Sequence, residues 1–126
     1  MSEHESRKRE HLNARRYSDS LEFVRNKFED RSNVEIVRGL LADTLVAVDG
    51  RKIAYLSVDL NNAPSEQAVN QRLWPQLVPG ALVAMDDYSF KGHQAQYGMW
   101  NALAARHRLP IATLPTGQGL LLKPRG

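Results

Sequence analysis

Apolar residues form several short runs whose pattern is typical of β-strands. Residues 53–60 (IAYLSVDL) and 81–85 (ALVAM) are nearly continuous in apolar side chains, which predicts strands covered on both faces of a parallel sheet. A β-branched run at 34–37 predicts a further short strand. Near the end of the chain, residues 111–114 and 120–123 predict a hairpin, because two glycines between them can adopt positive φ.

Helical spacing of apolar residues lies between these runs. It predicts amphipathic helices over 21–30 and 93–107, and a third that begins at Pro64 and ends near Trp74. Residues 40–48 have the pattern of a short helical turn, and Pro79-Gly80 predicts a turn before the second long strand. Strands that alternate with helices indicate an α/β fold: a doubly wound, mostly parallel sheet with a C-terminal antiparallel hairpin.

Composition and charge narrow the class of protein. The 126 residues, 42% of them hydrophobic, fit one domain, and no apolar run approaches the length of a membrane span. There is no cysteine, and residues 1–16 are polar, so they predict a flexible arm rather than a signal peptide. We therefore expect a cytoplasmic protein. The net charge is +3, and the basic residues of 88–126 are scattered among apolar ones, which argues against nucleic-acid binding.

Three acids mark the expected site. Asp59 lies at the end of the first buried run, and Asp86 and Asp87 directly follow the second. In doubly wound sheets ligands bind at the carboxyl ends of the strands. If the two strands are neighbours, their ends lie about 4.8 Å apart, so the carboxylates could share a hard divalent cation such as Mg²⁺. In the alternative reading, Asp86 caps the next helix and Asp87 makes a turn hydrogen bond.

Other polar and aromatic residues have both functional and structural interpretations. His93, at a helix start, could act as a base, or it could face solvent in the first turn. His107 ends the same helix and is interpreted as structural. Tyr88 and Trp100 are interpreted as core or rim aromatics. The two hairpin glycines need no phosphate to explain them.

From about Leu12 onward the chain resembles the C-terminal half of class I S-adenosylmethionine-dependent methyltransferases, in particular the macrocin O-methyltransferase-like group. The most specific part is an acid-ended strand, a helix, and then L-V-P-G, an apolar strand and D-D-Y. The resembling segments are SLEFVRNKF, NVEIVRGLLADTL, KIAYLSVDLN, LWPQLVPGALVAMDDYSFKGH and LPTGQGLLLKP. On this resemblance, residues 17–126 are the C-terminal half of a methyltransferase-like α/β domain.

The resemblance implies a cofactor, a metal and residues for each. Mg²⁺ would be bound by Asp59, Asp86 and Asp87, and S-adenosylmethionine would contact Leu41, Ala42 and Asp59. The implied reaction is metal-assisted formation of an alkoxide from the hydroxyl of a small molecule, followed by in-line methyl transfer.

The chain departs from the family pattern in two places. Asn61 stands where the family often has a second acid, so Asp59 and His93 remain as catalytic candidates. No G-x-G-x-x-G-like loop occurs, and the first two strands of the family have no counterpart.

Without those strands, the edge of the strand at 53–60 would be exposed. We therefore expect a homo-oligomer, a missing N-terminal half, or a fragment of a longer protein. The alternative function is a truncated, non-catalytic methyltransferase-like domain that acts as a homodimeric or partner-binding module.

Overall fold

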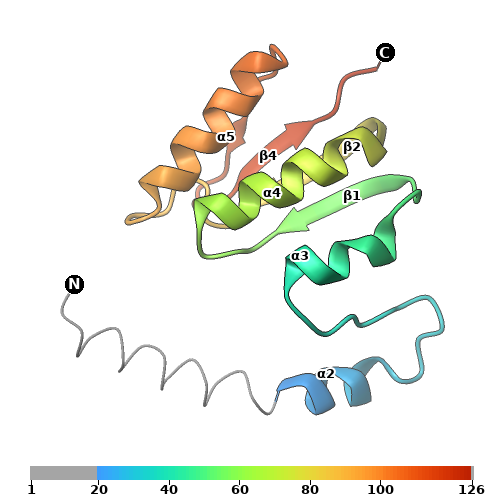
Figure 1. Cartoon of the computed structure of the whole chain (residues 1–126). Coiled ribbons are helices and arrows are strands. Elements are labelled where there is room, and N and C mark those ends of the chain that lie inside the picture. Colours follow the sequence, from blue (N-terminus) through green and yellow to red (C-terminus); the bar gives the residue numbers. More distant parts are fainter. Residues whose placement is uncertain (1–19, 126) are drawn as a thin grey trace. The chain divides into compact units, whose positions relative to one another are not determined.

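The computed structural model describes residues 20–125 (Figure 1). The predicted arm at 1–16 lies outside these residues. The chain divides into two compact units with the boundary between Thr44 and Leu45, and each unit is described by itself.

In its described residues, 20–44, the first unit contains α2 (Ser20–Phe28) and α3 (Leu41–Thr44). The helix predicted over 21–30 is confirmed as α2. The strand predicted at 34–37 is wrong, because this segment has no strand partner among residues 20–125. Val34 and Val37 are exposed there. A β-branched run becomes a strand only when a neighbouring strand accepts and donates its backbone hydrogen bonds.

The second unit is built on a four-stranded sheet in the order β1-β2-β4-β3. Its strands are β1 (Ile53–Val58), β2 (Leu77–Met85), β3 (Ala112–Thr113) and β4 (Gly119–Leu122). β1 and β2 are parallel, whereas β2–β4 and β3–β4 are antiparallel. The predicted α/β class, the parallel pairing of the two long apolar runs and the closing hairpin are confirmed, and the sheet of the described residues is mixed.

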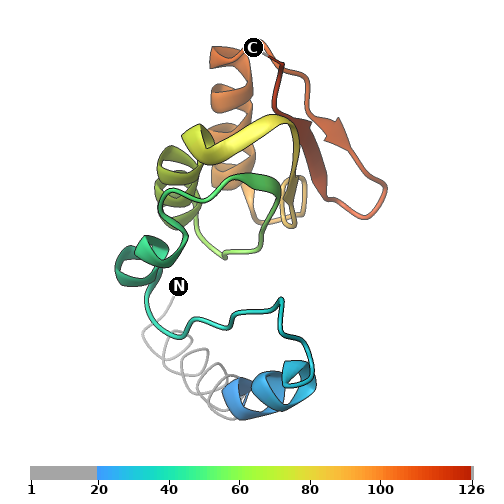
Figure 2. The ribbon, with the colours of Figure 1, turned by 90° about the vertical axis from the view of Figure 1, so that its right-hand side faces the viewer.

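Helices connect the strands of this unit and cover one face of the sheet. The 3₁₀ turn η1 (Leu45–Val48) precedes β1, and the predicted helical character of 40–48 is thus confirmed in α3 and η1. α4 (Ala63–Leu73) joins β1 to β2 through the 3₁₀ turn η2 (Trp74–Gln76), and α5 (Gln94–Arg106) follows β2. Figure 2 shows α4 and α5 on the same side of the sheet.

The start of α4 follows from its sequence. Asn62 Oδ1 accepts a hydrogen bond from the backbone N–H of Ser65 at 2.8 Å, and a proline stands in the first turn. An N-cap side chain satisfies a backbone donor that has no partner inside the helix, and proline fits there because it has no N–H to leave unpaired. The helix therefore begins a few residues after Asp59, and the end of β1 lies close to its N-terminus.

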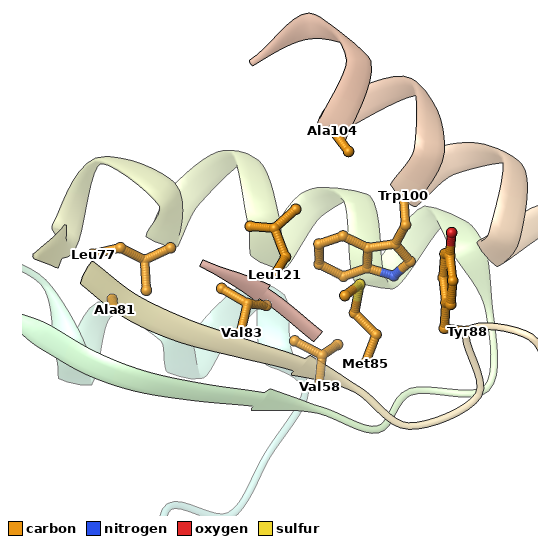
Figure 3. Close-up of a cluster of buried hydrophobic side chains, with 9 residues drawn as sticks. All are labelled: Val58, Leu77, Ala81, Val83, Met85, Tyr88, Trp100, Ala104 and Leu121. Atoms are coloured by element: carbon orange, nitrogen blue, oxygen red, sulfur yellow. The ribbon is translucent and has the colours of Figure 1, made fainter. Parts of the chain in front are cut away.

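The core lies between the sheet and the two helices (Figure 3). Alternate residues of β2 point into it: Ala81, Val83 and Met85 are each 1% exposed. Trp100 projects from α5 onto this layer and is fully buried. Its indole is the largest of the fully buried side chains, so it anchors α5 to the sheet.

The opposite face of the sheet is not covered within the second unit. Tyr55 of β1 is 59% exposed and Leu122 of β4 is 60% exposed. The expectation that residues 53–60 are covered on both faces is therefore not met in the described part of the chain. The reason is that α4 and α5, which supply the helical cover, pack on the same face.

The turn predicted at Pro79-Gly80 is wrong, because both residues lie inside β2. The register with β1 passes from Ile53 opposite Leu77 to Tyr55 opposite Leu82, so β2 contains extra residues at this point. Gly80 has φ +83°, a conformation that glycine adopts without a steric penalty. The chain therefore bulges here and continues in the same direction instead of reversing.

No helix within residues 20–125 is both long enough and apolar enough to cross a membrane.

Candidate functional site

The three acids meet at one edge of the sheet. Asp59 directly follows β1, and Asp86 and Asp87 directly follow β2. One carboxylate oxygen from each lies within 4.8 Å of the others. The backbone N–H of Asp86 donates to the carbonyl of Val58 at 3.0 Å, which ties the two strand ends together. The prediction that parallel neighbouring strands bring these acids to the same edge is confirmed.

The charges of this acid cluster repel one another. Asp59 is exposed, whereas Asp86 and Asp87 are half-buried. Partial desolvation at the strand end, followed by the charges of Asp86 and Asp87, raises the pKa of Asp59. Three carboxylate oxygens at this separation are a donor set that suits a hard divalent cation, which would also neutralise the repulsion. The cluster thus fits Mg²⁺ by its chemistry.

Asp86 does not cap the next helix, but Asp86 and Asp87 both take part in structural hydrogen bonds. The next helix, α5, begins at Gln94 with His93 at its N-cap, so Asp86 does not cap it. Asp86 Oδ1 instead accepts a hydrogen bond from Gln118 Nε2 at 3.0 Å. The turn after β2 is closed by the backbone carbonyl of Asp87, which accepts from Phe90 N–H at 3.3 Å. The Asp86 side chain is therefore bonded to the hairpin through Gln118, and its carboxylate also belongs to the acid cluster.

His93 lies beside the acid cluster and is partly buried, with 24% of its side chain exposed. Its Nδ1 is 2.9 Å from Gln96 Oε1 and 4.0 Å from Asp87 Oδ2. It makes no capping hydrogen bond to α5. This position is compatible with a chemical role and differs from that of a solvent-facing histidine in the first turn of a helix.

A buried polar network lies next to the site, and the sequence did not predict it. Glu66 is 3% exposed and Gln96 is 4% exposed. Glu66 Oε2 accepts from Trp100 Nε1 at 2.7 Å, and Gln96 Nε2 donates to the Leu60 carbonyl at 3.1 Å. A glutamate in the first turn of a helix normally indicates a solvated, dipole-stabilising position. The available signal was the tryptophan, because a buried indole N–H requires an acceptor.

Glu66 gives the stability of the protein a pH dependence. Burial raises the pKa of Glu66, and this outweighs the hydrogen bonds from Trp100, Gln96 and Leu60, which lower it. A raised folded-state pKa contributes stability below the ordinary pKa of 4.5, and this contribution is lost as the pH rises through the folded-state value. We therefore expect the unmodified protein to lose stability relative to Glu66→Gln over that range.

Denaturant unfolding of both proteins at a series of pH values measures this effect. Glutamine at position 66 does not titrate. Altered hydrogen bonds in the variant can therefore shift its free energy of unfolding by a constant amount, but they do not change how the difference between the two proteins depends on pH. A stability difference that is flat with pH, or that moves in favour of the unmodified protein as the pH rises, would contradict the assignment.

The remaining candidates have structural explanations. Tyr88 is 4% exposed, its hydroxyl donates to Asn101 Oδ1, and burial raises its pKa. Tyr88 and Trp100 are thus core residues, as predicted. Gly119 packs directly against the Tyr88 ring, so the hairpin needs no phosphate. His107 caps α5 and stacks on Trp74 with ring centroids 4.5 Å apart, which agrees with its structural interpretation.

Leu41 and Ala42 open α3 in the first unit. Their role as cofactor contacts stays a prediction.

Comparison with solved structures identifies the fold. The chain is similar to the O-methyltransferase NovP, with a TM-score of 0.71 and 21% identity, over 93% of this chain and 51% of NovP. It is also similar to CalS11, a TDP-rhamnose 3′-O-methyltransferase of calicheamicin biosynthesis, with a TM-score of 0.59 and 22% identity, over 68% of this chain and 40% of CalS11. This chain thus spans about half the length of NovP, or less than half that of CalS11. A comparison with curated protein sequences finds no match.

The family comparison covers most of the sequence. The sequence model described as Macrocin-O-methyltransferase (TylF) matches residues 2–109, which include the acid cluster, His93 and the buried network. The resemblance to the macrocin O-methyltransferase-like group is therefore confirmed. The chain belongs to the TylF macrocin-O-methyltransferase family.

Proposed function

We propose that this chain is the metal-binding, C-terminal half of an S-adenosylmethionine-dependent O-methyltransferase that acts, with Mg²⁺, on a hydroxyl of a small molecule. The observation that carries the proposal is the acid cluster. Asp59, Asp86 and Asp87 converge within 4.8 Å at the carboxyl ends of two parallel strands, where doubly wound folds bind their ligands. Family membership supports methyl transfer as the reaction.

The three carboxylates would hold the metal ion. A divalent cation there would supply Lewis-acid chemistry, which lowers the pKa of a hydroxyl bound to it. The protein's own contribution is to aim the ligands: Gln118 donates to Asp86 Oδ1 at 3.0 Å, and the Asp86 N–H bond to Val58 fixes the strand ends. His93, 4.0 Å from Asp87, would orient the hydroxyl beside the acids.

The residues of this chain that we propose as contacts of S-adenosylmethionine are Leu41 and Ala42 in the first unit and Asp59 in the second. Methyl transfer from a sulfonium requires an in-line approach of the hydroxyl oxygen, so positioning supplies much of the rate. NovP and CalS11 are described as O-methyltransferases, and CalS11 as acting on a TDP-sugar. These descriptions support a small-molecule hydroxyl as the substrate class proposed here.

A partner would complete the sheet. In the described residues β1 pairs only with β2, so its other edge is open, and open edges favour pairing with another chain. We infer that an N-terminal half or a second copy covers this edge. The same observation favours the second candidate function, a non-catalytic module that assembles through β1.

Isothermal titration distinguishes the two functions. If the chain has the enzymatic function, we expect S-adenosylmethionine to bind it in at least one of two conditions, with Mg²⁺ or without Mg²⁺. The unmodified chain is titrated with the cofactor under both conditions, with Asp87→Asn as the variant that removes one ligand. A flat trace in both conditions would exclude the enzymatic function for this chain alone and leave the module.

A further inference from the structure

Side-chain hydrogen bonds lead from Glu66, a buried residue in the first turn of α4, to the ring of His93. The Glu66 carboxylate accepts from Trp100 Nε1, from the Gln96 side chain and from the backbone N–H of Leu60. Glu66 and Gln96 are 3% and 4% exposed. Water is therefore excluded from both groups, and their hydrogen-bond partners are set by the protein.

These partners determine which way the Gln96 amide points. Its Nε2 donates to the Leu60 carbonyl at 3.1 Å, and its side chain also bonds the Glu66 carboxylate. A backbone carbonyl only accepts hydrogen bonds, so the amide nitrogen of Gln96 must face the Leu60 carbonyl. The amide oxygen is left for the remaining neighbour, which is His93.

The position of the amide oxygen determines the tautomer of His93. Gln96 Oε1 lies 2.9 Å from His93 Nδ1. An amide oxygen cannot donate, so Nδ1 must carry the hydrogen, and Asp87 Oδ2, 4.0 Å from the same nitrogen, favours that arrangement. A neutral imidazole has a single N–H, so Nε2 keeps its lone pair. No hydrogen bond to Nε2 is formed by the residues the structure describes.

We propose that Gln96, held by Glu66 and the Leu60 carbonyl, is a positioning residue that fixes the hydrogen of His93 on Nδ1 and leaves Nε2 as a hydrogen-bond acceptor beside the acid cluster. The inference that a substrate hydroxyl binds to this acceptor rests on the proposed function. The inference about the tautomer does not. Neutral imidazole in water favours the hydrogen on Nε2, so the network inverts the ordinary preference.

Long-range ¹⁵N–¹H NMR of the chain labelled in its histidines reads the tautomer directly. The spectra are recorded at alkaline pH, because the tautomer is a property of the neutral ring. His93 is assigned by the loss of its signals in His93→Gln. We expect a protonated, pyrrole-type shift for Nδ1 and an unprotonated, pyridine-type shift for Nε2. Gln96→Met keeps the length of the side chain but cannot accept the hydrogen bond. In this variant the Nδ1 and Nε2 shifts should move toward those of the tautomer favoured in water, which carries its hydrogen on Nε2.

Gln94→Met is the matched control, because Gln94 is exposed on the same helix, and it should leave the His93 shifts unchanged. A His93 ring protonated mainly on Nε2 in the unmodified protein overturns the proposal, whether or not Gln96→Met folds. A folded Gln96→Met with unchanged shifts overturns it as well. The measurement needs no metal, cofactor or substrate, so its outcome is separate from that of the titration that tests the proposed function.

Discussion

Trp100→Phe is expected to lower the free energy of unfolding by about 2–4 kcal/mol. Two losses add together. The smaller ring leaves a void in a fully buried position against Met85, and the indole N–H that reaches Glu66 Oε2 at 2.7 Å disappears. The carboxylate of Glu66 would then be buried with one donor fewer. Denaturant unfolding followed by far-ultraviolet circular dichroism measures the change.

Trp74→Phe is the matched control, since it makes the same substitution at a half-buried site. Trp74 stacks on His107, and a phenyl ring can keep that contact, so we expect a loss below about 1 kcal/mol. Equal losses in the two variants would show that the bond between Trp100 and Glu66 adds nothing beyond ring volume.

Gly119→Ala is expected to cost about 1–3 kcal/mol, near the upper end of that range. A Cβ at this position would lie 2.7 Å from Cγ and Cδ1 of Tyr88 and 3.0 Å from its Cβ. Tyr88 cannot move away easily, because it is 4% exposed and hydrogen-bonded to Asn101. Thermal unfolding should show the loss as a clearly lowered Tm. Tyr88 lies in the turn after β2, next to Asp86 and Asp87, so the variant should also weaken the binding of any ligand by these two acids.

Gly98→Ala, in the middle of α5, is the control for a glycine with open space around it. Alanine is favoured over glycine inside a helix, so this variant should be more stable by about 0.5–1 kcal/mol. If Gly119→Ala is as stable as the unmodified protein, the close packing of β4 against Tyr88 is not present in solution.

The sequence predicted the parts of the fold that depend on local pattern. The long apolar runs at 53–60 and 81–85 became β1 and β2, and the two glycines near the C-terminus marked the hairpin. It failed where a segment's structure depends on distant partners. The run at 34–37 has strand-forming residues but no neighbouring strand in the described part of the chain. Gly80 forms a bulge inside β2 instead of a turn, because the strand pairing continues beside it: the carbonyl of Lys123 accepts a hydrogen bond from Gly80 N–H at 2.8 Å.

The candidate site shows the same division. Asp59, Asp86 and Asp87 were predictable, because parallel strands end at one edge and acids follow both of them. Glu66 and Gln96 were not predictable, because they lie on helices at positions that look solvated, and only the packing of α4 and α5 on one face buries them. Polar residues that support a site through other residues have no short-range signature in the sequence.

The central claim is that the acid cluster binds a divalent cation, and thermal unfolding with and without millimolar Mg²⁺ tests it most directly. A ligand that binds only the folded state raises its stability, by about 2.7 kcal/mol at a concentration of 100 Kd. We predict that Mg²⁺ raises the Tm of the unmodified chain and that Asp86→Asn and Asp86→Ala abolish most of that rise. Without Mg²⁺, Asp86→Asn should be at least as stable as the unmodified chain, because one repelling charge is gone and the side-chain oxygen that accepts from Gln118 is kept. A Tm of the unmodified chain that does not respond to Mg²⁺, together with a loss of stability confined to Asp86→Ala, would contradict the claim and show that these acids are structural.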